Sequence, residues 1–251
     1  MKPKRKNNMY AIETHNLAKK YKDTVAVDSL CLKIEKGELF SLLGVNGAGK
    51  TTTIKMLTCL LKNSGGDALV NGMSILTHSD KIKEIIGISP QETAVAPNLT
   101  VEENLKFICG IYGFSKEKTA QKTQKIIEEF SLSEVKNKRA SRLSGGFQRR
   151  LSMAMAIICE PQILFLDEPT LGIDVISRSE IWDIIRKLKG EITIILTTHY
   201  MEEAEALSDR IGIMKNGRLI ALGKAEELKN KANTQKFEDA FIKIVKGEII
   251  C

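Results

Sequence analysis

The chain has 251 residues, of which 43% are hydrophobic and 27% charged, and it carries a formal net charge of +7. This composition is that of an ordinary globular protein rather than a disordered one, and no apolar run approaches the roughly 18 residues that cross a bilayer. Residues 1–8, MKPKRKNN, form a basic leader without the apolar centre of a signal peptide, so we expect a cytosolic chain. We interpret this leader as solvated and disordered rather than as an arm for nucleic acid, and we expect no specific nucleic-acid partner; contact with an anionic membrane surface is left open.

The first predicted elements are two strands, at residues 10–13 and 30–34, where apolar residues alternate or cluster. Lys36-Gly37 then supplies a turn before the next apolar run. We therefore expect the chain to begin with an antiparallel β subdomain.

A glycine-rich run, GVNGAGKT at residues 44–51, follows an apolar strand pattern at 39–43 and precedes a helical pattern at 52–57. Glycines let the backbone turn tightly and direct its N–H groups inward, the helix N-terminus adds partial positive charge, and Lys50 adds a full one. Thr51 offers a hydroxyl to a Mg²⁺ ion that bridges terminal phosphates. The spacing and its context predict a phosphate-binding P-loop. Its nucleotide-binding residues are expected to be Gly44, Val45, Asn46, Gly47, Ala48, Gly49, Lys50, Thr51 and Thr52.

Helical spacing replaces strand patterns from about residue 95 to residue 160, and Thr100 with Glu103 forms a capping box at the start of one helix. We expect this segment to be a helical subdomain inserted into an α/β core. Near its end, Ser144 and the glycines that follow stand at the start of another helix, where they form a second anion cradle. The simpler alternative is that Ser144 is only a helix N-cap.

A buried strand pattern at residues 162–166 ends in two adjacent carboxylates, Asp167 and Glu168. Ligands bind at the carboxyl ends of strands in a parallel sheet, so Asp167 is expected to hold Mg²⁺ and Glu168 to act as general base on an attacking water. Without the upstream P-loop, an exposed acidic loop would be the better interpretation.

Strand patterns recur at residues 192–196 and, around a Lys215-Asn216-Gly217 hairpin signal, at 210–214 and 218–222. A helix is expected between the carboxylates and residue 192, beginning with a capping box at Ser177-Arg178-Ser179-Glu180. Alternation of strand and helix implies a parallel sheet. The predicted fold class is therefore α/β, with a P-loop NTPase core, an antiparallel β subdomain and an inserted helical subdomain.

Five ordered motifs together make residues 9–230 resemble the ATP-binding cassette (ABC) ATPases. These are the P-loop, the signature-like run Leu143 to Arg150, the carboxylate strand, the Gln91 segment and Thr197-Thr198-His199. The resemblance implies ATP and Mg²⁺ as cofactors and adds roles for four more residues. His199 would contact the terminal phosphate, Gln91 would sense Mg²⁺ and the attacking water, Tyr21 would stack on adenine, and Asp174 would link two active sites.

The resemblance also implies partners. Two chains would pack head to tail as an ATP-dependent homodimer, with each ATP bound between one P-loop and the signature residues Ser144, Gly145, Gly146 and Phe147 of the other chain. Val45 stands where many members have proline, and Phe147 replaces the commoner glutamine. Neither departure removes a phosphate ligand.

The single copy of the motif set favours a transporter subunit over soluble cassette ATPases. Residues 40–44, 51–57 and 199–205 resemble the ATPase subunits of drug, antibiotic and lipid exporters, which work with separate polytopic transmembrane permeases. The resemblance implies a location on the cytoplasmic face of the cell membrane. The tail at 231–251 is similar to the terminal helix of that branch or is a plain amphipathic packing helix. A soluble cassette ATPase of translation or DNA repair is the alternative, and a small P-loop kinase is disfavoured because it has no use for the signature motif. The sequence does not name the transported substrate.

Overall fold

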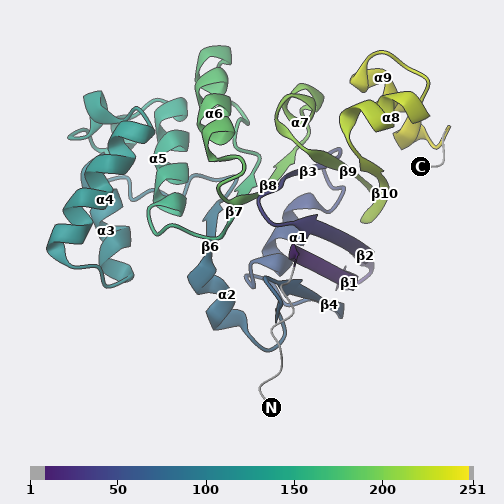
Figure 1. Ribbon diagram of the computed structural model, residues 1–251, viewed down its shortest axis with the longest axis horizontal. Helices are drawn as coiled ribbons and strands as arrows, with labels where there is room; N and C mark the ends of the chain where they lie inside the picture. Colours follow the sequence, from purple (N-terminus) through teal and green to yellow (C-terminus); the bar gives the residue numbers. More distant parts are fainter. Residues whose placement is uncertain (1–8, 249–251) are drawn as a thin grey trace. The chain divides into compact units, whose positions relative to one another are not determined.

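The computed structural model describes residues 9–248, so the predicted leader at 1–8 and the end of the predicted tail, 249–251, lie outside them. The chain divides into two compact units (Figure 1). One, here called the P-loop unit, runs to Glu84 and resumes at Lys189, and the other, the helical unit, comprises Ile85–Leu188. Each unit is described separately.

The P-loop unit begins with an antiparallel sheet, as predicted from the two opening strand patterns. Its strand order is β2-β1-β4-β5, and each neighbouring pair is antiparallel. The long first pair keeps apolar side chains such as Ile12 and Ile34 on a fully buried face. The strands are β1 (Tyr10–Tyr21), β2 (Thr24–Glu35), β4 (Gly65–Val70) and β5 (Met73–Ser74).

A parallel arrangement in the same unit places β3 (Leu39–Leu43) between β8 (Thr193–Thr198) and β9 (Arg210–Lys215). Every residue of β3 and β8 is buried, which explains why their sequences are continuous apolar or small runs rather than alternating ones. The predicted hairpin is confirmed: β10 (Arg218–Gly223) pairs antiparallel with β9 through Asn216 and Gly217. Both connecting residues have positive φ, of 48° and 78°, the backbone that a two-residue hairpin requires.

Helices cover the strands of the P-loop unit, and the last one packs on its core. α9 sends Phe237, Phe241 and Ile244 into a buried cluster that also contains Leu43 of β3 and Ala204 of α7. Figure 1 shows α8 and α9 in yellow, beside β10. Phe237–Lys246 of the predicted tail is therefore a helix packed on the core, and its likeness to the terminal helix of the exporter branch stays a prediction. The helices are α1 (Lys50–Leu57), α2 (Ser79–Ile85), α7 (Met201–Leu207), α8 (Ala225–Lys231) and α9 (Phe237–Lys246).

The helical unit combines a parallel strand pair, β6 and β7, with four helices. The predicted capping box at Thr100 is present, since its hydroxyl accepts from Glu103 N and the Glu103 carboxylate accepts from Thr100 N. β6 lies so close to α5 that a Cβ at Gly87 would collide with the carbonyl oxygen of Ala156. The elements are β6 (Ile86–Ser89), α3 (Val101–Ile111), α4 (Lys116–Glu129), α5 (Gly145–Ile157), β7 (Ile163–Asp167) and α6 (Val175–Leu188), with short 3₁₀ turns at Ser133–Val135 and Ala140–Arg142.

The predicted start of α6 is wrong. We expected a capping box to begin at Ser177, but the helix begins at Val175. Asp174 caps it, because its carboxylate accepts from the backbone N–H groups of Ile176 and Ser177. An aspartate that reaches two backbone donors is a better cap than a serine inside the first turn.

Candidate functional site

The P-loop wraps around the ammonium of its own lysine. Lys50 Nζ donates to the carbonyl oxygens of Gly44, at 2.7 Å, and Val45, at 3.3 Å. Gly49, with a φ of 105°, occupies the N-cap position of α1, and no side chain caps the helix there. The first turn of α1 contains no acidic residue. A buried cation and a helix N-terminus therefore share one loop, and both favour a bound anion.

Glycine is required at two positions of this loop for packing reasons. A Cβ at Gly44 would lie 2.5 Å from the carbonyl oxygen of Met214, and one at Gly49 would collide with the carbonyl oxygen of Ala26. Gly47 has open space around it, but its φ of 80° favours glycine. The donors and the close-packed backbone fit a phosphate chain, as the sequence predicts.

His199 lies directly after β8, in the same unit as the P-loop. The strand end is tied to the P-loop, because Gly44 N donates to the carbonyl oxygen of Thr198 at 3.4 Å. The half-buried His199 ring contacts the Tyr200 ring at a centroid distance of 4.1 Å. Tyr21 ends β1, where its ring is exposed and the Lys19 ammonium lies 5.0 Å from the ring centroid.

The predicted carboxylates lie in the helical unit, at the end of β7. Asp167 and Glu168 are 4% and 6% exposed, so neither belongs to an exposed acidic loop. Glu168 has a φ of 52°, in the left-handed region that costs a non-glycine residue roughly 1–2 kcal/mol. Ser131 and Glu160 of this unit also have positive φ, but both are exposed, so Glu168 is the buried one of the three. Strained backbone of this kind concentrates at functional sites.

The Gln91 segment is positioned by a residue that sequence reasoning missed. Arg149 on α5 donates to the carbonyl oxygens of Pro90, at 2.7 Å, and Gln91, at 2.6 Å. A hydroxyl pair at 3.0 Å, Ser89 with Ser152, joins the same two elements. Gln91 itself is exposed, whereas Arg149 is buried. The sequence did contain a signal for this role. Arg149 and Arg150 stand at the start of a helix whose following residues are apolar, and a charged side chain buried in such a helix must find hydrogen-bond partners inside the protein.

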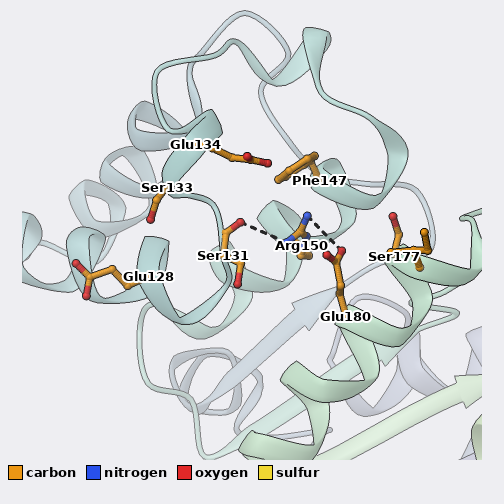
Figure 2. Close-up of a pocket in the computed structure, with 9 residues that line it drawn as sticks. Glu128, Ser131, Ser133, Glu134, Phe147, Arg150, Ser177 and Glu180 are labelled. Carbon is orange, nitrogen blue, oxygen red and sulfur yellow. Dashed lines mark hydrogen bonds and ion pairs between the residues drawn. The ribbon is translucent and has the colours of Figure 1, made fainter.

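The signature-like residues form the first turn of α5. Ser144 is its N-cap and accepts from Phe147 N at 3.5 Å, so the helix-cap interpretation holds without excluding an anion cradle. Phe147 is half-buried, and its ring centroid lies 4.2 Å from the guanidinium of Arg150. Both residues line a pocket of about 710 Å³, shown in Figure 2.

Asp174 stands just before α6, in the same unit as the carboxylates and the signature-like residues. Hydrogen bonds from the backbone N–H and then the hydroxyl of Ser177 hold the pKa of the Asp174 carboxyl below its ordinary value. The structure therefore groups the predicted residues in two sets. Tyr21, the P-loop and His199 belong to the P-loop unit, while Gln91, Ser144 to Phe147, Asp167, Glu168 and Asp174 belong to the helical unit.

The sequence profile described as ABC transporter matches residues 27–171, more than half of the chain. The chain belongs to the ABC transporter family. This ABC transporter chain is 41% identical over 241 residues to the probable multidrug ABC transporter ATP-binding protein YbhF of Escherichia coli K12. The alignment covers 93% of the chain and 41% of YbhF, so the chain spans less than half of that relative. It is also 41% identical over 221 residues to the daunorubicin/doxorubicin resistance ATP-binding protein DrrA of Streptomyces peucetius, covering 88% of the chain and 67% of DrrA.

Solved ABC transporter structures share the fold. An ATP-binding subunit of an ABC transporter, 24% identical, aligns with a TM-score of 0.83 over 93% of this chain and 99% of its own. The dimeric bacterial ABC transporter cassette MJ0796, 27% identical, aligns with a TM-score of 0.78 over 85% of this chain and 98% of its own. These likenesses confirm the predicted α/β P-loop NTPase fold with its antiparallel and helical subdomains. Among residues 9–248, no helix has the length and apolar character to cross a membrane.

Proposed function

We propose that the chain is the ATP-binding and ATP-hydrolysing subunit of an ABC-type membrane exporter. The observation that carries the hydrolytic part is the buried, backbone-strained Glu168 after β7, in a chain whose other unit holds the P-loop. A buried carboxylate that follows the carboxyl end of a strand, with a backbone conformation that costs free energy, is a candidate for a general base. The cassette motif set supports ATP as the substrate.

Each predicted residue receives a role in this proposal. Lys50 and the backbone N–H groups of residues 44–52 hold the phosphates, and Tyr21 stacks on the adenine. Thr51, Asp167 and Gln91 would hold Mg²⁺, which would neutralise phosphate charge when bound. Glu168 accepts a proton from the attacking water, while His199 contacts the terminal phosphate.

The proposed protein partner for catalysis is a second copy of this chain. Ser144, Gly145, Gly146 and Phe147 would complete the ATP site of the other copy, and Asp174 would link the two sites. The relative MJ0796 is described as a dimeric cassette, which supports this arrangement. We further propose that ATP, and not ADP, favours the closed pair, since only the terminal phosphate needs charge compensation from both sides.

The exporter assignment rests on the relatives. YbhF is named a probable multidrug transporter ATP-binding protein, DrrA a drug resistance ATP-binding protein, and human ABCA3, 42% identical over 210 residues, a phospholipid-transporting ATPase. We infer that the chain works at the cytoplasmic face of the membrane with a separate polytopic permease. These names favour transport over the alternative of a soluble cassette ATPase in translation or DNA repair.

Substitution of the proposed base tests the hydrolytic assignment. Glu168→Gln should keep ATP binding and reduce turnover at least about 100-fold, because it removes the proton acceptor and leaves the phosphate cradle intact. Phosphate release and ATP binding are measured on the same preparation. Glu191→Gln, at an exposed glutamate, is the matched control and should retain activity. Turnover near that of the unsubstituted chain by Glu168→Gln would refute the assignment.

A further inference from the structure

The first turns of α5 and α6 approach each other through Gly146 and Ser177. Gly146 is buried, and a Cβ built there would lie 2.6 Å from Ser177 Cβ and would also collide with Ser177 Oγ. By contrast, a Cβ at the exposed Gly145 would find only Ile173 Cγ2, at 3.9 Å. The two helices are thus so close at this point that a residue larger than glycine at position 146 would collide with Ser177.

The hydroxyl of Ser177 is held in place by Asp174. Ser177 Oγ donates to Asp174 Oδ2 at 2.8 Å, and Ser177 N donates to Asp174 Oδ1 at 2.9 Å. The same carboxylate accepts from Ile176 N at 3.0 Å. Ser177 is therefore bonded to the loop before α6 and packed against the signature-like turn of α5.

A second tie joins the two helices one turn further on. Arg150 Nη2 on α5 lies 3.4 Å from Glu180 Oε2 on α6, and Arg150 Nη1 donates to the carbonyl oxygen of Ser131 at 3.3 Å. Figure 2 shows the arginine between these two partners, with Ser177 on the same helix as Glu180. Arg150 is 5% exposed, whereas the side chain of Glu180 is 46% exposed, so the arginine is the packed member of this ion pair. Positions 146 and 150 of α5 thus meet positions 177 and 180 of α6.

We propose that Ser177 is a positioning residue that fixes Ser144 and Asp174 relative to each other, so that the two turns meet a second copy of the chain as one rigid body. The proposal rests on the ATP-dependent dimer of the proposed function. It also assigns Gly146 a role inside its own subunit. A side chain there would push α5 away from α6 and displace the N-cap turn, whether or not it reached a nucleotide.

A double-mutant cycle tests the contact. Gly146→Ala, Ser177→Gly and the double variant are each made in the Glu168→Gln background, with Ser179→Gly as the matched control for a glycine in an exposed position of α6. Urea unfolding measures packing, a fluorescent ATP analogue measures binding to the monomer, and sedimentation with ATP measures self-association. We expect Gly146→Ala to weaken self-association at least about tenfold with unchanged ATP binding. Ser177→Gly alone should weaken it by about threefold, because the hydroxyl bond to Asp174 is lost, and association like that of the Glu168→Gln background would refute the positioning role. In the double variant Ser177→Gly should restore association to the level of Ser177→Gly alone, because the collision at position 146 is gone.

The alternatives give different patterns. If the alanine only obstructs nucleotide held by the other copy, Ser177→Gly will not restore association, and the proposal fails. If the unfolding cycle shows no coupling between positions 146 and 177, the packing contact itself is refuted. A third result is that Glu168→Gln itself fails to associate with ATP while the unfolding cycle still shows coupling between positions 146 and 177. The dimer of the proposed function then fails, and the positioning role with it, but the packing contact stands.

Discussion

At the scale of single residues, two charged side chains on α5 are buried for different purposes. Arg150 ties α5 to Ser131 and α6, whereas Arg149 holds the backbone of the Gln91 segment through two short hydrogen bonds. Hydrogen bonds that involve a charged group are shorter and stronger than neutral ones, and a bidentate guanidinium fixes direction as well as distance. The placement of Gln91 thus depends on a residue 58 positions away in sequence.

Arg149→Lys should destabilise the chain although it keeps the charge. A lysine is a single-point donor and cannot reproduce both bonds, so we expect a loss of about 1.5–3 kcal/mol in the free energy of unfolding. Urea denaturation measures this loss. Arg142→Lys, at an exposed arginine, is the control and should change stability by less than about 0.5 kcal/mol. Equal effects of the two substitutions would show that the hydrogen bonds of Arg149 to Pro90 and Gln91 do not contribute as described.

At the scale of elements, α9 belongs to the core of the P-loop unit. Phe237 is 2% exposed in the cluster with Leu43, the residue that precedes the P-loop. Phe237→Ala should therefore cost about 3–5 kcal/mol, the usual range for a buried phenylalanine. Ile242→Ala on the same helix removes a side chain that is 42% exposed and should cost much less. Thermal or urea unfolding compares them, and similar losses would show that α9 does not pack as described.

The elements also show what the sequence could and could not predict. The P-loop, the hairpin around Asn216-Gly217 and the capping box at Thr100 depend on residues a few positions apart, and all of these local patterns formed as predicted. The predicted start of α6 was wrong because Asp174 and Ser177 are both residue types that cap helices. Only the three-dimensional arrangement shows that Asp174 accepts from the backbone N–H groups. The contact of Gly146 with Ser177 and the bonds of Arg149 depend on how distant elements cross, which no short-range pattern encodes.

At the scale of the whole molecule, the proposed dimer predicts that the mass of the protein in solution depends on the bound nucleotide. The Glu168→Gln variant should sediment as a dimer with ATP and as a monomer with ADP, because the terminal phosphate is compensated from both sides only in the closed pair. Lys50→Ala in the same background is the control. It removes the ammonium that the P-loop surrounds and should prevent ATP-driven association. A monomer at every protein concentration, with ATP demonstrably bound, would contradict the dimer.

Transport gives the last prediction, because closing and opening two ATP sites can move a solute only when the motion is transmitted to a path through the bilayer. We therefore expect the full chain to be recovered from native membranes in gentle detergent with a polytopic membrane protein, whose hydropathy profile and mass identify it. Its ATPase rate should change when that protein is present, since a partner that favours one state of the pair shifts the population of both. Glu168→Gln should co-purify equally well, because it alters turnover and leaves the docking surface unchanged. Recovery bound to ribosomes or DNA instead, with no membrane protein, would favour the soluble-cassette alternative and refute the exporter assignment.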